Sequence, residues 1–145
     1  MNKLKLNIDG FKCFKEDTSI EFNAITLLTG ANSAGKSSVV QSLLLLKTLS
    51  EGNLSNSDSL IELDLNDEKY ALNLGTYDDI RNKSNDVYED FMEQDSKDIR
   101  FLLDGAKASI RIQENIESGN KVRVVTDEQS LALMKALLDC CFVYL

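Results

Sequence analysis

Residues 30–38 read Gly30-Ala31-Asn32-Ser33-Ala34-Gly35-Lys36-Ser37-Ser38. The stretch satisfies G-x-x-x-x-G-K-[ST] at every fixed position. An apolar run at 25–28 precedes it, and a helix-like run at 37–49 follows it. A strand, a glycine-rich turn and a helix N-terminus together form a cradle for phosphate groups. The sequence therefore predicts a P-loop, in which all of residues 30–38 bind nucleotide.

The residue types in this loop indicate separate roles. Gly30 and Gly35 let the backbone turn with its N–H groups pointing inward, as an anion nest requires. Lys36 is expected between the β- and γ-phosphates, and the Ser37 hydroxyl is expected on Mg²⁺. Residues 31–34 supply mainly backbone. The segment 82–85 lacks the Asp of a guanine-reading N-K-x-D, so the expected cofactors are ATP and Mg²⁺.

The composition restricts the other functions. The net charge is −8, so DNA binding would need a partner or a local basic patch, and histidine chemistry is excluded because the chain has no His. Phe11 to Lys15 could stack adenine or touch DNA phosphate, although a loop of core phenylalanines and solvated lysines is the favoured interpretation. Cys13, Cys140 and Cys141 form no metal-ligand or disulfide framework. Without a signal peptide or apolar span, a cytoplasmic protein with no membrane partner is expected.

Hydrophobic patterning predicts an α/β fold. Apolar residues alternate with polar ones near 4–8 and 19–22, and the run 25–29 is expected to be a buried central strand. Segments 61–65 and 70–74 are expected to form a hairpin. Three more strands are expected at 99–103, 108–112 and 121–125. The predicted architecture is a P-loop lobe with a mixed central sheet and an antiparallel β-subdomain.

Two helices carry the strongest signals. The run 37–49 is apolar around most of its circumference, which predicts burial against a sheet. Thr126 and Gln129 fit a capping box that opens a second helix through Leu138. Segment 76–98 is interpreted as short helices and loops.

Further residues carry a family resemblance. The motif residues are Leu6-x-Ile8-x-Gly10-Phe11-Lys12-Cys13-Phe14, Ile20-x-Phe22 and residues 25–38. They resemble the start of the RecF/SMC-like ABC ATPases. More narrowly, GANSAGKSSVVQSLLLL together with LNLGTYDDI at 72–80 resembles ATPases grouped with the OLD nucleases and anti-phage ATPases of the Septu type. The resemblance implies ATP binding in a head that dimerises around nucleotide, in DNA-linked defence or repair.

Other parts of that family pattern are missing. We find no signature motif and no switch His, and the best match to a Walker B strand is 122–128, ending in Asp127-Glu128. The ordinary interpretation of those two carboxylates is a helix N-terminus. Residues 1–145 are therefore interpreted as the N-terminal lobe of an ATPase domain, which by itself would not hydrolyse ATP.

Two alternatives remain open. One is a complete small P-loop kinase or NTPase that uses Asp127 and Glu128, and the other is a non-hydrolysing nucleotide-sensing or assembly subunit. The apolar terminus 142–145 suggests a surface covered by a missing C-terminal lobe or by a second chain, in a homo- or hetero-oligomer.

Overall fold

The computed structural model describes residues 4–15, 18–23, 25–31, 35–51, 61–68, 72–83, 98–104, 107–115, 117 and 121–141. The elements, in chain order, are β1 (Leu4–Asp9), β2 (Thr18–Phe22), α1 (Lys36–Glu51), β3 (Ile61–Asp64), α2 (Tyr77–Ile80), β4 (Ile99–Leu103), β5 (Ala108–Glu114), β6 (Lys121–Val125) and α3 (Glu128–Cys141). The α/β class is as expected. The tail 142–145 and the acidic stretch 84–97 lie outside the described residues.

The strands form one six-stranded sheet in the order β2-β1-β4-β5-β6-β3. Every strand pair is antiparallel. The antiparallel part of the predicted architecture is therefore present, whereas the mixed central sheet does not form within the described residues. Antiparallel strands commonly bury one face and leave the other to solvent. Here β1 shows that alternation, with Leu4, Leu6 and Ile8 buried between more exposed neighbours.

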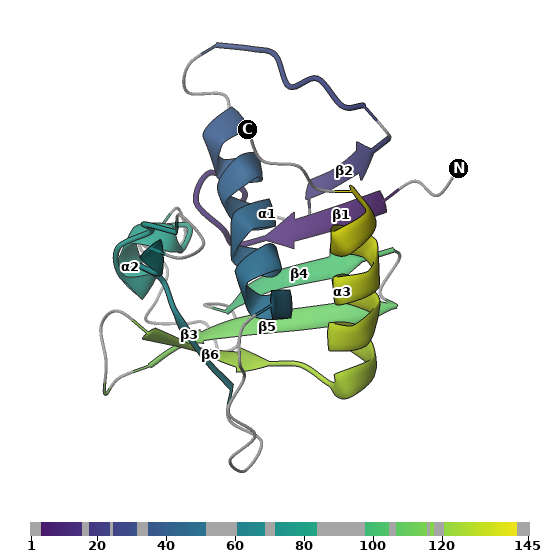
Figure 1. Ribbon diagram of the computed structural model, residues 1–145. Helices are drawn as coiled ribbons and strands as arrows, with labels where there is room; N and C mark the ends of the chain where they lie inside the picture. Colours follow the sequence, from purple (N-terminus) through teal and green to yellow (C-terminus); the bar gives the residue numbers. More distant parts are fainter. Residues whose placement is uncertain are drawn as a thin grey trace.

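The helices α1 and α3 pack side by side on one face of the sheet (Figure 1). The inner face of α1 supplies Leu45, Leu46 and Leu49, each at most 1% exposed, which confirms the expected burial of this helix. At the sheet centre, the Phe11 and Phe101 rings lie 5.6 Å apart between centroids, in a tilted arrangement. Phe11 therefore belongs to the core, which supports the structural interpretation of the Phe11 to Lys15 segment.

The expected hairpin between 61–65 and 70–74 forms only in part: the Leu72 N–H donates to the Asp67 carbonyl at 2.9 Å. β3 pairs with β6, in a register that sets Ile61 opposite Val124. Residues 72–74 form no strand, although Leu72 and Leu74 are buried and the Leu74 N–H donates to the Leu65 carbonyl at 2.9 Å. The alternating pattern therefore marked the buried residues correctly, and the two segments meet through these backbone bonds, although only Ile61–Asp64 forms a strand.

The expected capping box at Thr126 is also wrong. The Thr126 hydroxyl donates to the Ser109 carbonyl at 2.8 Å, because Thr126 comes directly after β6 and is engaged by β5. Asp127 caps α3 in its place, and its Oδ1 accepts from the Ser130 N–H at 2.6 Å. Ser130 Oγ in turn accepts from the Ser109 N–H at 3.0 Å. The backbone carbonyl and N–H of Ser109 are thus paired with Thr126, just before α3, and with Ser130, in its first turn.

The segment 25–29 departs most from expectation. The apolar run predicts a buried central strand, yet Ile25 is 92% exposed and Leu27 is 83% exposed. The segment forms no strand and runs away from the sheet before it turns into α1 (Figure 1). A central strand needs neighbours on both edges, and no described strand lies beside this segment.

Candidate nucleotide-binding site

The phosphate loop connects the open segment 25–29 to the N-terminus of α1. Of the predicted nucleotide-binding residues, the structure describes Gly30, Ala31, Gly35, Lys36, Ser37 and Ser38, whereas Asn32, Ser33 and Ala34 lie outside the described residues. Gly30 and Gly35 have φ values of 146° and 91°. Side-chain-bearing residues rarely adopt such values, so both glycines fit the tight turn that the sequence predicts.

The Lys36 side chain spans the loop. Its Nζ atom donates to the Gly30 carbonyl oxygen at 2.5 Å. This bond places the ammonium group at the mouth of the loop, between its first glycine and the helix. An anion bound in the loop would contact this cation, and such a charge-assisted contact is stronger than a neutral one.

The N-terminus of α1 suits an anion for a second reason. The first N–H groups of a helix have no acceptor within the helix, and the helix dipole makes this end positive. The first turn of α1 holds no acidic residue, and the Val39 N–H to Gly35 carbonyl bond, at 3.0 Å, closes the turn that follows the loop. The exposed Ser37 hydroxyl lies in the same turn, where a hard cation beside a phosphate would find an oxygen ligand.

A second loop, from earlier in the chain, packs against Gly35 of the phosphate loop. A Cβ atom built on Gly35 would lie 2.9 Å from Cys13 Sγ and 3.4 Å from Phe14 Cζ. The turn Gly10 to Phe14 is therefore in close contact with the phosphate loop. Lys12 in this turn adopts a left-handed φ of 50°, and burial lowers the pKa of its ammonium group, against the raising effects of Asp79 and Cys13.

That supporting turn is fixed by the segment around α2. The Asn82 side chain donates to the Lys12 carbonyl at 2.7 Å, and the Asn82 N–H donates to the Gly10 carbonyl at 2.9 Å. The Lys12 N–H donates to the Ile80 carbonyl at 2.7 Å. Sequence analysis missed the role of Asn82, because an amide that bonds to a distant backbone leaves no local pattern.

The α2 segment has its own anchors. Asn66 holds Gly75 from both sides: its Oδ1 accepts from the Gly75 N–H at 3.0 Å and its Nδ2 donates to the Gly75 carbonyl at 2.9 Å. Gly75 has a φ of 82°, and a Cβ there would lie 2.3 Å from Asp79 Oδ2. That Asp79 oxygen accepts from the Thr76 N–H at 2.8 Å and from its hydroxyl at 3.0 Å. These bonds hold the pKa of Asp79 below its usual value.

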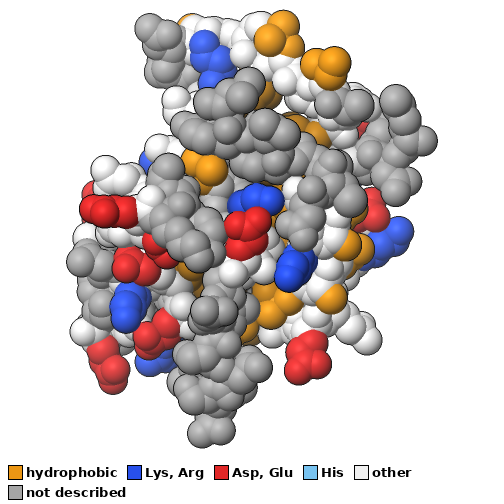
Figure 2. Space-filling view, viewed as in Figure 1, with side chains coloured by type: hydrophobic (Ala, Val, Ile, Leu, Met, Phe, Trp, Pro, Cys, Tyr) orange, Lys and Arg blue, Asp and Glu red, His pale blue; other side chains and the backbone are white. Residues whose placement is uncertain are grey.

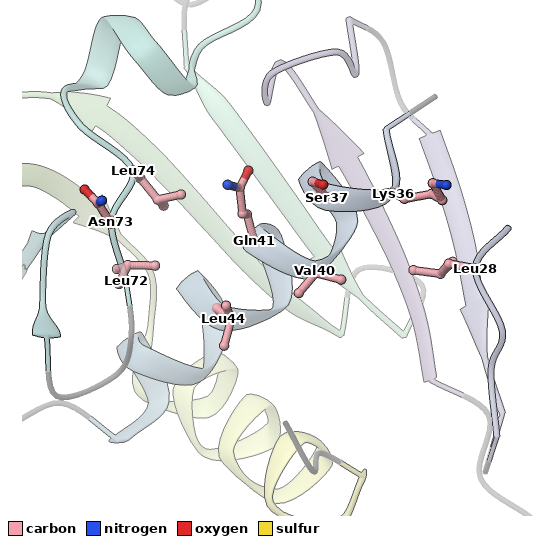
Figure 3. A pocket seen from close by; sticks show the side chains of 9 residues that line it. All are labelled: Leu28, Lys36, Ser37, Val40, Gln41, Leu44, Leu72, Asn73 and Leu74. Atoms are coloured by element: carbon pink, nitrogen blue, oxygen red, sulfur yellow. The ribbon is translucent and has the colours of Figure 1, made fainter. Parts of the chain in front are cut away.

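A hollow of about 530 Å³ opens beside the loop, along the outer side of α1 (Figure 3). Lys36 and Ser37 lie at the loop end of this hollow, and Asn73 lies at the other end. Apolar and polar side chains line it together: Leu28, Lys36, Ser37, Val40, Gln41, Leu44, Leu72, Asn73 and Leu74. The predicted phosphate-binding groups thus face a space that extends well beyond the loop.

The weaker candidates Asp127 and Glu128 are not brought to this site. They lie at the N-terminal end of α3, and α3 runs antiparallel to α1, so the two carboxylates lie at the opposite end of the helical layer from Lys36 (Figure 1). Asp127 is already engaged as the cap of α3. This geometry supports the structural interpretation of both residues.

Most of the chain matches a known family. The family model for the AAA ATPase domain matches residues 1–135. The chain belongs to the AAA ATPase domain family. Members of this family are nucleotide-binding ATPases that use ATP, typically with Mg²⁺. No match was found among curated proteins or solved structures.

None of the described helices is long and apolar enough to span a membrane.

Proposed function

We propose that this member of the AAA ATPase domain family is the Mg-ATP-binding N-terminal lobe of an ABC-type ATPase of the RecF/SMC-like group. The observation that carries the proposal is the Lys36 ammonium held at the Gly30 carbonyl, across a loop that leads into the N-terminus of α1. The sequence motifs at 6–14 and 72–80 support the RecF/SMC-like and OLD-like assignment, and hence a role in DNA-linked defence or repair.

The residues of the site fit ATP with Mg²⁺. Backbone N–H groups of residues 30–38 would hold the phosphates, Lys36 would neutralise charge between the β- and γ-phosphates, and Ser37 would supply a metal ligand. When bound, Mg²⁺ supplies additional positive charge beside the phosphate oxygens. The chain's own residues bind and orient the nucleotide in this proposal.

Hydrolysis needs a group that positions the attacking water, and transfer of the γ-phosphate benefits from further cations. Among the described residues, no carboxylate lines the hollow beside Lys36. We therefore assign catalysis to the assembly with a further lobe or a second chain. A steady phosphate release from the pure chain that disappears in both Lys36→Ala and Glu128→Gln would instead support a compact NTPase.

Calorimetry with Mg-ATP tests the binding function. Lys36→Ala removes the cation at the loop while the backbone nest remains, so the variant should bind more weakly with little change in fold. Lys47→Ala is the matched control, since Lys47 lies in the same helix and pairs with Glu51 at 3.0 Å, away from the loop. Equal ATP affinity in the wild type and Lys36→Ala would refute the proposal.

A further inference from the structure

Asn66 follows β3 and binds Gly75 through both groups of its side-chain amide. The Asn66 backbone N–H donates to Asp64 Oδ1 at 2.9 Å, so the Asp64 side chain closes the turn after β3. The Asn66 Oδ1 accepts from the Gly75 N–H at 3.0 Å, and its Nδ2 donates to the Gly75 carbonyl at 2.9 Å. In this place an alanine makes neither bond, and an ionised aspartate makes only the first. Asn66 therefore joins the sheet to the start of the α2 segment.

Gly75 connects this bond pair to α2, the short teal helix in Figure 1. Thr76 precedes the helix, and Asp79 Oδ2 accepts from the Thr76 N–H at 2.8 Å and from its hydroxyl at 3.0 Å. A Cβ atom on Gly75 would lie 2.3 Å from the same Asp79 oxygen. The residue that Asn66 binds is thus in contact with the cap of α2, and a shift of Gly75 would move the first turn of the helix.

The helix α2 is a connector of a single turn. A helix of four residues is not stable by itself in water, so its position is set by its contacts. Tyr77 and Ile80 pack on the inner side and are 6% and 0% exposed. Asp78 and Asp79 are exposed on the outer side, and Figure 2 shows acidic side chains at the surface where Figure 1 places α2. The position of α2 therefore depends on its inner side and on its two ends.

The far end of α2 bonds to the turn that packs on the phosphate loop. The Ile80 carbonyl accepts from the Lys12 N–H at 2.7 Å. The Asn82 side chain donates to the Lys12 carbonyl, also at 2.7 Å. The same turn lies against Gly35, where a Cβ atom would stand 2.9 Å from Cys13 Sγ. Groups packed this closely transmit a displacement to their neighbours. One end of α2 is thus bonded to the sheet and the other to the support of the phosphate loop.

We propose that Asn66 is a positioning residue for the nucleotide: through α2 it holds the turn Gly10 to Phe14 in the place that shapes the phosphate loop. Asn66 belongs neither to the loop nor to the residues that line the hollow beside it. Its action is therefore carried by the contacts of α2. The consequence for Mg-ATP rests on the proposed function, whereas the contacts themselves do not depend on nucleotide.

Hydrogen exchange of the full chain without nucleotide, followed by NMR, tests the connection. The Lys12 and Phe14 N–H groups bond to the Ile80 and Phe11 carbonyls. Asn66→Ala should speed exchange at these two groups about fivefold more than in the central strands β4 and β5. A loss of overall stability alone would speed exchange equally in all parts that open by global unfolding. An equal increase throughout the chain, or unchanged exchange at Lys12 and Phe14, would overturn the connection.

Calorimetry with Mg-ATP measures the effect on the nucleotide. Asn66→Ala should weaken binding about threefold to tenfold, the size expected from the loss of one or two hydrogen bonds. Glu68→Ala is the matched control, because Glu68 is an exposed residue just after Asn66, and this variant should bind like the wild type. Wild-type affinity in a folded Asn66→Ala variant would overturn the positioning role.

A double-mutant cycle tests whether Asn66 acts through the support of the loop. Adding Asn66→Ala to Asn82→Ala should weaken Mg-ATP binding by less than about twofold beyond Asn82→Ala alone, whereas independent losses would multiply. Multiplied losses would overturn the proposal. If Asn66→Ala does not fold, Asn66→Asp, which keeps the acceptor for the Gly75 N–H, replaces it in the same measurements. The expected exchange in a chain whose wild type binds no Mg-ATP would leave the connection intact and refute the proposed function.

Discussion

Gly35 lies directly against Cys13, since a Cβ atom on Gly35 would stand only 2.9 Å from the Cys13 sulfur. The contact joins the phosphate loop to the turn Gly10 to Phe14, which the sequence places far from it. Asn82 fixes that turn through two hydrogen bonds. The shape of the loop therefore depends on a support built from three separate segments of the chain.

Gly35→Ala is expected to weaken Mg-ATP binding and to lower the free energy of unfolding. The new methyl group meets Cys13 Sγ, and the φ of 91° is unfavourable for any residue with a Cβ. Calorimetry and urea denaturation measure the two effects. The double variant Gly35→Ala with Cys13→Gly should recover the part of both losses that the close contact with Cys13 Sγ causes. Wild-type ATP affinity in Gly35→Ala would contradict the assigned loop geometry.

Asn82→Ala tests the support from the other side. The variant loses the bond to the Lys12 carbonyl, and a lost hydrogen bond of this kind costs about 0.5–1.5 kcal/mol. The freed turn should also weaken ATP binding, although Asn82 is not among the predicted nucleotide-binding residues. Asn73→Ala, at an exposed asparagine of the same segment, is the control for stability. If Asn82→Ala and the wild type have the same urea midpoint of unfolding, the turn does not depend on the Asn82 amide.

Asp79 should make the stability of the chain sensitive to acid. Hydrogen bonds from Thr76 lower the pKa of Asp79 in the folded state. Its contribution is therefore complete above the ordinary aspartate pKa of 3.8 and is lost as the pH falls through the lower folded value. The stability difference between the wild type and Asp79→Asn should accordingly shrink in acid, as urea denaturation at neutral and low pH would measure.

Asp78 provides a comparison for that experiment. Its pKa is also lowered, but by Arg81 and Lys83, whose side chains lie 2.7 and 3.1 Å from its oxygens. Salt screens such exposed ion pairs. Added salt should thus reduce the effect of Asp78→Asn more than that of Asp79→Asn. An equal salt response in the two variants would contradict these assigned causes.

Asp127→Ala should destabilise the fold without changing ATP affinity. The substitution removes the cap of α3, and loss of such a cap costs about 0.5–2 kcal/mol. Glu128→Gln should change neither stability nor ATP affinity appreciably, because Glu128 is exposed at the far end of the helical layer from Lys36. Thermal unfolding and calorimetry measure both variants. A marked loss of ATP affinity in either variant would contradict this structural interpretation and place Asp127 and Glu128 in the nucleotide site.

Local patterns predicted much of the fold. Alternation near residues 4–8 and at 99–103, 108–112 and 121–125 corresponds to β1, β4, β5 and β6, and the apolar run at 37–49 corresponds to α1. Such patterns report which side chains are buried, and they do not name the neighbour. Leu72 and Leu74 illustrate the limit: they are buried as the alternation indicates and bond to Asp67 and Leu65, yet they form no strand, and the strand partner of β3 is β6.

The site was predicted in part for a similar reason. Gly30, Gly35 and Lys36 form a contiguous motif whose chemistry depends on spacing alone. The supporting contacts of Cys13 and Asn82 depend on tertiary folding, which brings residues 13, 35 and 82 together. The spacing of Thr126 fits a cap, but Asp127 accepts from the Ser130 N–H in its place, and the Thr126 hydroxyl donates to the Ser109 carbonyl.

The position of β3 at the end of the sheet has a kinetic consequence. In the described sheet β3 pairs with β6 alone, and this pairing joins residue 61 to residue 124 across a long loop. Closing such a loop costs chain entropy before any contact compensates for it, so non-local strand pairs form slowly. β3 is therefore expected to dock last during folding and to detach first in local unfolding. Its release would uncover Leu63 and break the Asn115 to Glu62 hydrogen bond while the central strands stay paired.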